Sequence, residues 1–284
     1  MSFQLRKATR KTAKLRIGLS AASGFGKTYS ALLLAYGITG DWSKIALIDT
    51  ENGSGELYSH LGDYNALTLV APFHPERYAE AIRACEAAGM EVIIIDSISH
   101  EWEGTGGCLE LADQLAAQKY RGNSYVAWGE VTPRHQTFIN AILQSPAHII
   151  TTVRRKQAHE ISTNDRGKTT VTKVGTKEVT RDGFEYELTL SFELVSDHHI
   201  ARASKDRTGL FMGQPEFVIS EETGKLLKRW ADEGIDPLTE AITAMQAAPD
   251  LDTLQFLWSG NRRFQETPSF VEAKDMRKEE LLAA

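Results

Sequence analysis

The sequence predicts an α/β fold in which a mainly parallel central sheet is flanked by helices, with a small helical segment at the C-terminus. Short, almost continuously apolar runs alternate with helical stretches through the first half of the 284-residue chain. Such runs are typical of strands buried on both faces. A glycine-rich segment at residues 21–28 also lies between one apolar run and one helical stretch. Strands separated by helices form parallel sheets that are covered on both sides.

Five apolar runs are expected to supply the strands of this sheet. They occupy residues 15–20, 44–49, 67–70, 91–96 and 147–153. The run at 91–96, EVIIID, carries the strongest strand signal in the chain. Two further β-like segments, at residues 184–195 and 199–203, follow later in the chain.

Helices are expected between these runs and again at the end of the chain. One follows the glycine-rich segment, a second follows Pro75, and a third begins at Pro133 behind Thr132, because proline fits the first helical position. Residues 154–183 are polar and lack helical periodicity, which predicts a long mobile loop or a β-ribbon. The stretch that leads to Trp230 is rich in turn residues, and helical periodicity then returns over 237–257 and 269–282.

The predicted domain organisation follows from these patterns. Residues 1–14 form a basic N-terminal arm, residues 15–230 the α/β core, and residues 231–284 a helical C-terminal tail.

Composition and charge narrow the classes of protein. The formal net charge of −6 argues against a uniformly basic nucleic-acid binder. The charge is uneven, however: residues 1–16 hold six Lys/Arg and no acid, and residues 154–181 carry a balance of +5, which leaves −17 for the rest. Cys85 and Cys108 are too few for a disulfide scaffold and fit a reducing compartment. No apolar run is long enough to cross a bilayer, so we expect a cytoplasmic protein without a membrane partner.

The clearest motif is Ala21-Ala22-Ser23-Gly24-Phe25-Gly26-Lys27-Thr28. It matches the phosphate-binding pattern GxxxxGK[ST], except that alanine replaces the first glycine. Backbone N–H groups at such a turn converge on phosphate oxygens, and the following helix N-terminus adds positive potential. We expect residues 22–29 to bind ATP, with Lys27 on the β- and γ-phosphates and the Thr28 hydroxyl on Mg²⁺.

Two carboxylates at strand ends complete the predicted site. Asp96 ends the apolar run VIIID, where ligands bind in open α/β sheets, and is expected to organise Mg²⁺. Ser97 follows it, which disfavours ATPases that carry their water-activating glutamate directly after this aspartate. Glu51, beyond the run 44–49, is the better candidate base. Glu101 and Glu103 are expected to be surface carboxylates.

The segments LRIGLSAASGFGKT, ALIDTENGSGELY and VIIIDS occur in an order that resembles the RecA-type core of DNA recombination ATPases. The resemblance covers residues 15 to about 212. It implies a RecA-like P-loop NTPase core, with Glu51 as the catalytic base, Tyr58 stacking on adenine and Thr152 as a sensor, where bacterial RecA has glutamine. The segment from Lys205 to Gly209 is similar to a RadA stretch whose basic residues reach ATP on the neighbouring subunit. Lys205 and Arg207 are thus candidate trans-acting fingers, or else parts of a solvated basic turn.

The resemblance also implies single-stranded DNA as a partner, held by two loops of a homo-oligomer or filament. The first loop corresponds to residues 119–131, where Lys119, Arg121, Tyr125 and Trp128 combine cations with aromatic faces; alternatively, Tyr125 and Trp128 pack beneath the loop. The second corresponds to residues 154–183, whose candidate phosphate contacts are Arg154, Arg155, Lys156, Arg166, Lys168, Lys173 and Lys177. The alternative here is a solvated charged face. The small size and basic N-terminus resemble a phage-encoded ATPase that acts in single-strand annealing with single-strand-binding protein or another recombination partner, in the cytoplasm of a bacterial host.

The first functional hypothesis is therefore a Mg²⁺-dependent, DNA-stimulated ATPase of the RecA-like class, active in recombination or annealing. A P-loop kinase for a small molecule or nucleotide stays open, with residues 154–181 as its lid. So does a module that binds ATP without hydrolysing it and recruits a partner. His198 and His199 lack further ligands at metal spacing and make a poor zinc site.

Overall fold

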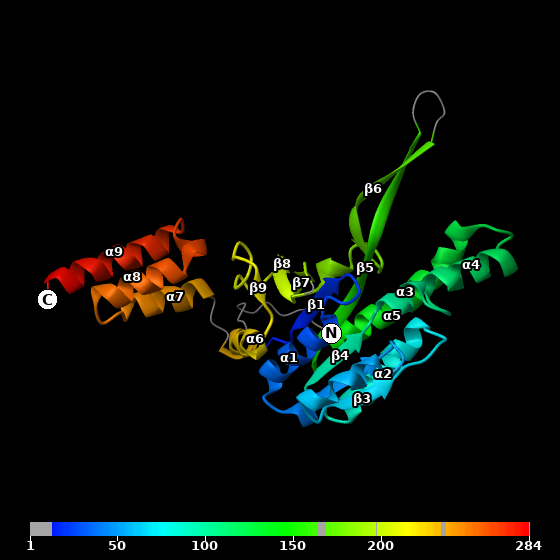
Figure 1. Ribbon diagram of the computed structural model, residues 1–284, viewed down its shortest axis with the longest axis horizontal. Coiled ribbons are helices and arrows are strands. Elements are labelled where there is room, and N and C mark those ends of the chain that lie inside the picture. The colour runs from blue at the N-terminus through cyan, green and yellow to red at the C-terminus, as the bar shows by residue number, and fades with distance from the viewer. Residues whose placement is uncertain (1–12, 164–168, 197, 234–236, 284) are drawn as a thin grey trace, which may run out of the picture.

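The computed structural model describes residues 13–163, 169–196, 198–233 and 237–283. It has a central sheet with helices on both faces (Figure 1), as the sequence predicts. Residues 1–12, which make up most of the predicted basic arm, lie outside the described residues. None of the described helices is long and apolar enough to cross a membrane.

The sheet is mostly parallel, in the order β3-β2-β4-β5-β1-β7-β8-β9. The pairs from β3 to β7 are parallel, whereas β8 and β9 are antiparallel to their neighbours. The strands are β1 (Arg16–Ala21), β2 (Ile45–Asp49), β3 (Asn65–Thr68), β4 (Val92–Asp96), β5 (His148–Thr163), β7 (Leu190–Leu194), β8 (Ile200–Asp206) and β9 (Phe217–Val218). Each of the five runs predicted to form the sheet overlaps a strand, although β3 lies two residues before the predicted 67–70. The β-like segment 184–195 contains β7 but begins with a 3₁₀ turn at Phe184–Glu187.

Within the stretch 154–183, residues 154–163 and 169–178 form a β-ribbon rather than an irregular loop. The strand β5 leaves the sheet and pairs along its outer half with the antiparallel strand β6 (Thr169–Glu178). Figure 1 shows this ribbon projecting from the body. One strand therefore belongs to both the core and the ribbon.

Helices cover the two faces of the sheet. On one face lie α1 (Lys27–Thr39) and α6 (Glu221–Glu233), and on the other α2 (Pro75–Ala87) and α5 (Ser124–Gln144). Along the chain, α3 (Ser99–Glu103) and α4 (Cys108–Gln118) come after α2 and before α5. The described part of the chain ends in α7 (Pro237–Gln246), α8 (Leu251–Gly260) and α9 (Pro268–Ala283). Short 3₁₀ turns occupy Trp42–Lys44, Ser54–Leu61, Phe184–Glu187 and Arg262–Phe264.

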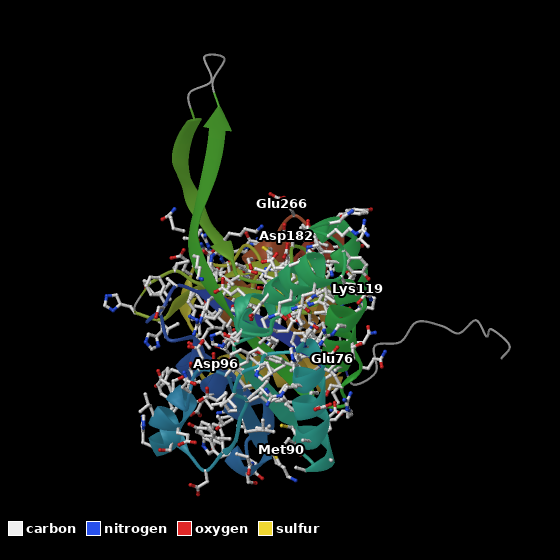
Figure 2. All side chains as sticks on the ribbon, turned by 90° about the vertical axis from the view of Figure 1, so that its right-hand side faces the viewer. Glu76, Met90, Asp96, Lys119, Asp182 and Glu266 are labelled. Atoms are coloured by element: carbon white, nitrogen blue, oxygen red, sulfur yellow. The ribbon has the colours of Figure 1, made fainter. Side chains whose placement is uncertain are left out.

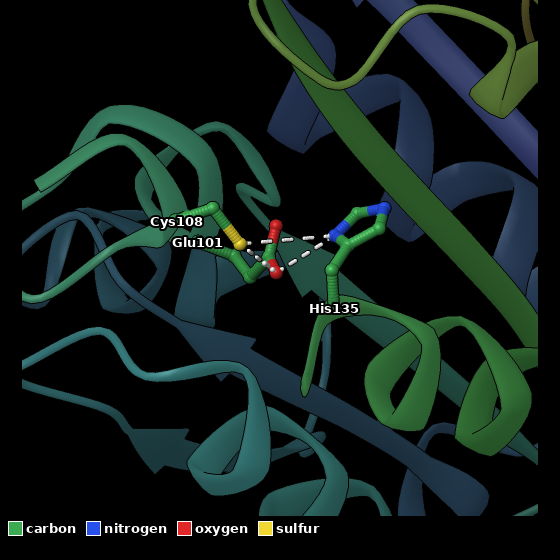
Figure 3. Close-up of side chains that lie close together, drawn as sticks. All are labelled: Glu101, Cys108 and His135. Carbon is green, nitrogen blue, oxygen red and sulfur yellow. Dashed lines mark hydrogen bonds and ion pairs between the residues drawn. The ribbon is translucent and has the colours of Figure 1, made fainter. Parts of the chain in front are cut away.

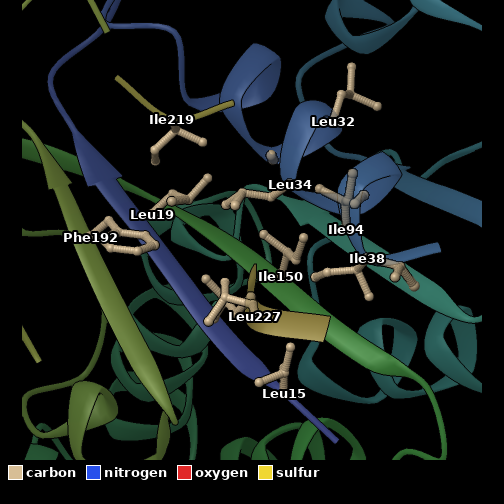
Figure 4. Close-up of a cluster of buried hydrophobic side chains, with 14 of the residues drawn as sticks. Leu15, Leu19, Leu32, Leu34, Ile38, Ile94, Ile150, Phe192, Ile219 and Leu227 are labelled. Atoms are coloured by element: carbon tan, nitrogen blue, oxygen red, sulfur yellow. The ribbon is translucent and has the colours of Figure 1, made fainter. Parts of the chain in front are cut away.

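Two hydrophobic cores hold these layers together. The first joins α1 and α6 to the sheet through side chains such as Leu34, Leu227 and Ile94 (Figure 4). The second joins α2 and α5 to the opposite face, where Ile93 and Ile95 point. Because successive residues of β4 alternate between the two cores, its apolar run is continuous, as expected for a strand buried on both faces. The helices α7–α9 have a separate cluster that includes Met245, Leu254 and Phe270.

Two helices differ from the expectations. The helix α5 begins at Ser124, not at Pro133, which lies inside it. The Asn123 side chain accepts a hydrogen bond from the Val126 N–H and caps the helix, and buried residues such as Ala127 and Val131 fix its first turns against the body. This packing outweighs the missing hydrogen bond at proline.

The helix α6 occupies a stretch expected to contain turns. Gly224 in α6 crosses Gly37 in α1 so closely that a Cβ on Gly37 would lie 2.1 Å from the Glu221 carbonyl oxygen. Glycine weakens a helix in isolation but allows this close crossing. Leu227 and Ala231 are fully buried on the same face.

Two polar residues anchor the start of β1. The Leu15 N–H donates to His148 Nδ1 at 3.0 Å. Arg16 is 5% exposed, and its guanidinium donates to the carbonyl oxygens of Ala147 and Ser145, which follow the end of α5. Arg16, counted with the basic N-terminal segment in the sequence, is therefore a structural cation, and burial lowers its pKa to about 10.

Candidate nucleotide site

The phosphate loop connects the end of β1 to the start of α1. Gly24 and Gly26 have φ values of +82° and +81°, which an L side chain rarely adopts. Gly26 is the N-cap of α1, and no side chain caps the helix, so the first N–H groups of α1 are left for an anion. Ala21 is the buried last residue of β1 and pairs with Arg154. Alanine at the first glycine position therefore lies in strand conformation and leaves the turn intact.

Lys27 closes back over this loop. Its Nζ donates to the carbonyl oxygens of Ala22 at 3.0 Å and Ala21 at 3.3 Å. Burial lowers the pKa of Lys27, and the nearby charges of Asp96 and Glu51 oppose that shift. The ammonium group thus lies at the loop where phosphate oxygens are expected.

Asp96 lies at the end of β4 beside the loop. It is 3% exposed; its Oδ2 accepts a hydrogen bond from Thr28 Oγ1 at 2.5 Å, and its Oδ1 accepts one from Thr152. Burial raises the pKa of Asp96, against the effect of these two hydroxyl donors. Hydroxyl and carboxylate oxygens are ligands that Mg²⁺ prefers, and Thr28 and Asp96 place both kinds at one point, so these residues fit the ion. Thr152, the expected sensor, is fully buried against Asp96.

Glu51 follows β2 on the neighbouring strand end and is held by Arg154. The guanidinium Nε donates to Glu51 Oε1 at 2.8 Å, and Nη2 donates to Oε2 at 2.5 Å. Burial opposes ionisation of Glu51, but the hydrogen bond and charge of Arg154 outweigh it, and the pKa of Glu51 is lowered. Asp49 shapes the loop, because its carboxylate accepts the N–H groups of Glu51 and Gly55 at 2.5 and 2.8 Å.

These groups surround one pocket of about 580 Å³. Its lining combines the phosphate loop, both strand-end carboxylates and the base of the ribbon: Ser23, Gly24, Gly26, Lys27, Thr28, Glu51, Ser54, Tyr58, Asp96, Arg154, Arg155, Lys156 and His199. Ala22 and Phe25 belong to the loop but are absent from this lining, and Phe25 packs against the first core.

Aromatic rings border the same pocket. Tyr29 lies 6.0 Å from Tyr58 and 5.3 Å from His199, between ring centroids. The His199 ring lies against the phosphate loop, since a Cβ added to Gly26 would meet it at 2.7 Å. Sequence reasoning considered His199 only as a metal ligand and did not place it here, because the turn between β7 and β8 that carries it has no sequence link to the motif.

The two glutamates expected at the surface differ. Glu103 is part-exposed and pairs with Lys156, between Oε1 and Nζ, at 2.6 Å. Glu101 is 1% exposed, so that expectation is wrong for Glu101. The cause is that α3 packs its side chain inward, against α4 and α5 (Figure 3).

The first candidate DNA loop is mostly helical. Residues 124–131 belong to α5, so the irregular part is limited to residues 119–123. Lys119 forms an ion pair with Glu130, and Arg121 is exposed with φ +53°. Trp128 stacks on Trp102 with ring centroids 5.5 Å apart, whereas Tyr125 is 89% exposed. The packing alternative therefore holds for Trp128 and not for Tyr125. Figure 2 places Lys119 away from the ribbon.

The cations at the base of the ribbon are paired with acids. Besides Arg154 with Glu51, Arg155 Nη1 lies 3.0 Å from Glu193 Oε1, and Lys177 Nζ lies 2.7 Å from Asp182 Oδ1. The positions Arg166 and Lys168 lie outside the described residues, and Lys173 is described only through the pairing of its backbone with His159. Figure 2 shows the ribbon rising from the side of the body where Asp96 lies.

The finger candidates Lys205 and Arg207 lie near the end of the sheet where β1 begins, opposite to the end that carries the phosphate loop. Lys205 and Asp206 pair with Ser191 and Leu190, beside the first half of β1, whereas the phosphate loop follows its last residue. Lys205 Nζ donates to the Glu185 carbonyl oxygen, and Arg207 Nη2 donates to that of Tyr186 at 2.7 Å. Neither residue lines the nucleotide pocket of its own chain.

Comparison with known families agrees with this geometry. The sequence profile of a family described as an AAA domain matches residues 13–233, which include the phosphate loop, both carboxylates and the ribbon. No curated protein sequence matches the chain.

Proposed function

Since the chain belongs to the AAA domain family of P-loop NTPases, we propose that it is a Mg²⁺-dependent ATPase that binds single-stranded DNA and acts in DNA recombination or annealing as an oligomer. The family supports nucleotide binding. The single observation that carries the DNA proposal is the shared pocket: Lys27, Asp96 and Glu51 line it together with Arg154, Arg155 and Lys156 from the base of the ribbon. A ligand on the ribbon and a nucleotide on the loop would therefore meet the same side chains.

The residues present account for hydrolysis. A water molecule attacks the γ-phosphorus, the bond to the bridging oxygen breaks, and ADP and phosphate leave. Lys27 and the first N–H groups of α1 would bind the phosphate oxygens, and Glu51, ionised at neutral pH, would orient the water and accept its proton. Mg²⁺ held by Thr28 and Asp96 would neutralise phosphate charge. Tyr58 would contact the base.

Arg154 would connect the two ligands. It lies on β5 where the strand leaves the sheet for the ribbon, paired with Ala21 of β1, and its side chain donates two hydrogen bonds to Glu51. Each Glu51 oxygen retains a second lone pair for water. DNA bound to the ribbon would compete for Arg154 and change how Glu51 is held, which is a physical route to DNA-stimulated hydrolysis.

The deciding experiment is steady-state ATP hydrolysis with and without single-stranded DNA over a salt series. We expect stimulation that weakens as salt rises, because phosphate contacts release counterions. The matched variant Lys27→Ala should show no turnover at an unchanged melting temperature. Wild-type turnover in that variant would refute the assignment of the site.

One observation favours a second candidate. Because Arg154 hydrogen-bonds to both oxygens of Glu51 and would weaken Glu51 as a base, the site also suits a module that binds ATP without hydrolysing it and recruits a partner such as single-strand-binding protein. Tight ATP binding with no turnover, at every salt concentration and with DNA present, would favour the module over the ATPase.

A further inference from the structure

A second cluster of reactive side chains lies outside the nucleotide pocket. Glu101 from α3, Cys108 from the first turn of α4 and His135 from α5 converge on one point (Figure 3). Their exposed fractions are 1%, 0% and 4%. None of the three lines the nucleotide pocket, so the proposed ATPase does not use them.

The three ligand atoms are close together and face one another. Glu101 Oε1 lies 3.0 Å from Cys108 Sγ and 2.9 Å from His135 Nδ1, and Sγ lies 3.9 Å from Nδ1. With the bond lengths of zinc to sulfur, nitrogen and oxygen, tetrahedral coordination separates such atoms by roughly 3.3–3.6 Å. Shifts of about half an ångström would therefore seat the ion.

The surroundings resemble the shell of a structural metal site. The cluster formed by Cys108, Leu111, Ala112 and Val131, with Trp102 and Trp128 against it, surrounds the point with largely apolar side chains. The segment before Cys108 is tightly folded, because a Cβ on Gly107 would lie 2.7 Å from two carbonyl oxygens. His135 also lines a surface pocket of about 190 Å³, which gives an ion a route to the cluster.

We propose that Glu101, Cys108 and His135 form a binding site for a divalent first-row transition metal, zinc above all, that ties α3, α4 and α5 together. A thiolate, an imidazole and a carboxylate are the ligand types that zinc takes. The thiolate and the carboxylate also cancel its two charges, which a buried site requires. The second Glu101 oxygen or a water molecule supplies the fourth position.

Binding requires the thiol proton to leave. Burial and the neighbouring Glu101 raise the pKa of Cys108, so the metal-free thiol is protonated and donates to Glu101. The ion displaces this proton to solvent, and the proton that His135 Nδ1 shares with Glu101 moves to Nε2, so that Nδ1 can bind the metal. Because the thiol proton is released, affinity rises with pH. If the three residues only hydrogen-bonded to one another and bound no metal, metal affinity would not rise with pH.

The test uses the full chain, reduced and stripped of metal by a chelator, with Co²⁺ as the probe. We expect one equivalent of Co²⁺ to produce a thiolate-to-cobalt charge-transfer band that Zn²⁺ abolishes. The band should be absent in Cys108→Ser, and Co²⁺ affinity should fall more than tenfold in His135→Gln. Cys85→Ser is the matched control, because Cys85 is also a buried free cysteine but lies in α2; it should retain the band.

Two results would overturn the proposal. One is a wild-type chain with no thiolate band. The other is a band that survives Cys108→Ser and disappears in Cys85→Ser. A variant that fails to fold does not prevent a decision, since wild-type thermal unfolding gives a second measurement: stoichiometric Zn²⁺ should raise the melting temperature, and an unchanged temperature counts against the site.

Discussion

At the scale of single residues, the candidate nucleotide site combines residues that sequence motifs predict with residues that no motif predicts. Lys27, Thr28 and Asp96 could be predicted because a phosphate loop needs these residue types at a strand-to-helix turn and at the end of a neighbouring strand. The pair Glu51–Arg154 joins residues 103 positions apart, and no local pattern encodes it. His199 reaches the loop from the β7–β8 turn. Contacts of this kind arise from sheet order, which residue spacing does not reveal.

The first prediction concerns Glu51 as the base. Glu51→Gln should bind ATP with affinity close to that of the wild type and hydrolyse it about 10²- to 10⁴-fold more slowly, because the amide cannot accept the proton. Single-turnover hydrolysis together with equilibrium nucleotide binding measures both effects. Glu103→Gln is the matched control, since Glu103 is outside the pocket lining. Normal hydrolysis by Glu51→Gln would show that another group activates water.

At the scale of elements, the parallel strands could be predicted and several other elements could not. A strand buried on both faces must be apolar at nearly every position, so β2, β4 and the inner half of β5 are visible in the sequence. The helix α6 was not, because Gly224 reads as a turn until its crossing with Gly37 is known. Likewise, Pro133 suggested a helix start, and only the packing of Ala127 and Val131 shows that α5 begins earlier.

The second prediction concerns the join between β1 and β5. Burial, and the positive charges of Lys14, Lys228 and Arg16, lower the pKa of His148 from 6.5 to about 3. The unfolded chain therefore binds the extra proton between these pH values. Stability that is complete above pH 6.5 is lost as the pH falls through this window. From pH 7 to pH 5 the free energy of unfolding should fall by about 2 kcal/mol from this residue.

Urea denaturation at the two pH values measures this effect. His148→Asn keeps an acceptor for the Leu15 N–H and removes the titration, so its stability should change less over the same range. An equal loss in the variant and the wild type would assign the pH dependence to other groups.

The third prediction concerns the ribbon. Replacing Lys156 and Lys177 by glutamine should weaken binding of single-stranded DNA and reduce the slope of log affinity against log salt by about 0.7 for each phosphate that the variant no longer neutralises. Fluorescence anisotropy over a salt series gives the slope. Lys225→Gln in α6 is the control, because Lys225 is an equally exposed ion-paired lysine outside the ribbon. A slope that changes as much in the control would remove the ribbon from the DNA site.

At the scale of the whole molecule, the net charge and the distribution of charge along the chain lead to different expectations about nucleic-acid binding. The total of −6 suggests no affinity for nucleic acid, but the stretch 154–181 carries a balance of +5, and its described cations Arg154, Arg155 and Lys156 lie where the ribbon meets the nucleotide pocket. The finger candidates lie beside the first half of β1, at the opposite end of the sheet from the loop. Lys205 and Arg207 could therefore act only on the nucleotide of another chain.

The fourth prediction follows from that placement. Arg207→Ala should reduce turnover by about 10³-fold or more, as expected for a finger that stabilises charge in the transition state. Mixing it with Lys27→Ala should restore activity that neither variant has alone, because one supplies the phosphate loop and the other the finger. ATP hydrolysis over a range of mixing ratios tests this. Mixtures that stay inactive at every ratio would show that Lys205 and Arg207 are not trans-acting fingers and belong only to a basic turn.

The continuity of β5 has a mechanical consequence. The strand extends from His148 to Thr163, with a shift in pairing register between Gln157 and His159, and Thr152, eleven residues before its outer end, donates a hydrogen bond to Asp96. A strand rises about 3.3 Å per residue, so this arm is roughly 36 Å long. A rotation of about 5° around its anchored half would move the outer end by about 3 Å while Thr152 barely shifts. Since Thr152 hydrogen-bonds to the carboxylate expected to organise Mg²⁺, a small rearrangement beside the phosphate loop would displace the outer end of the ribbon, and any ligand on it, much further than the residues at its base.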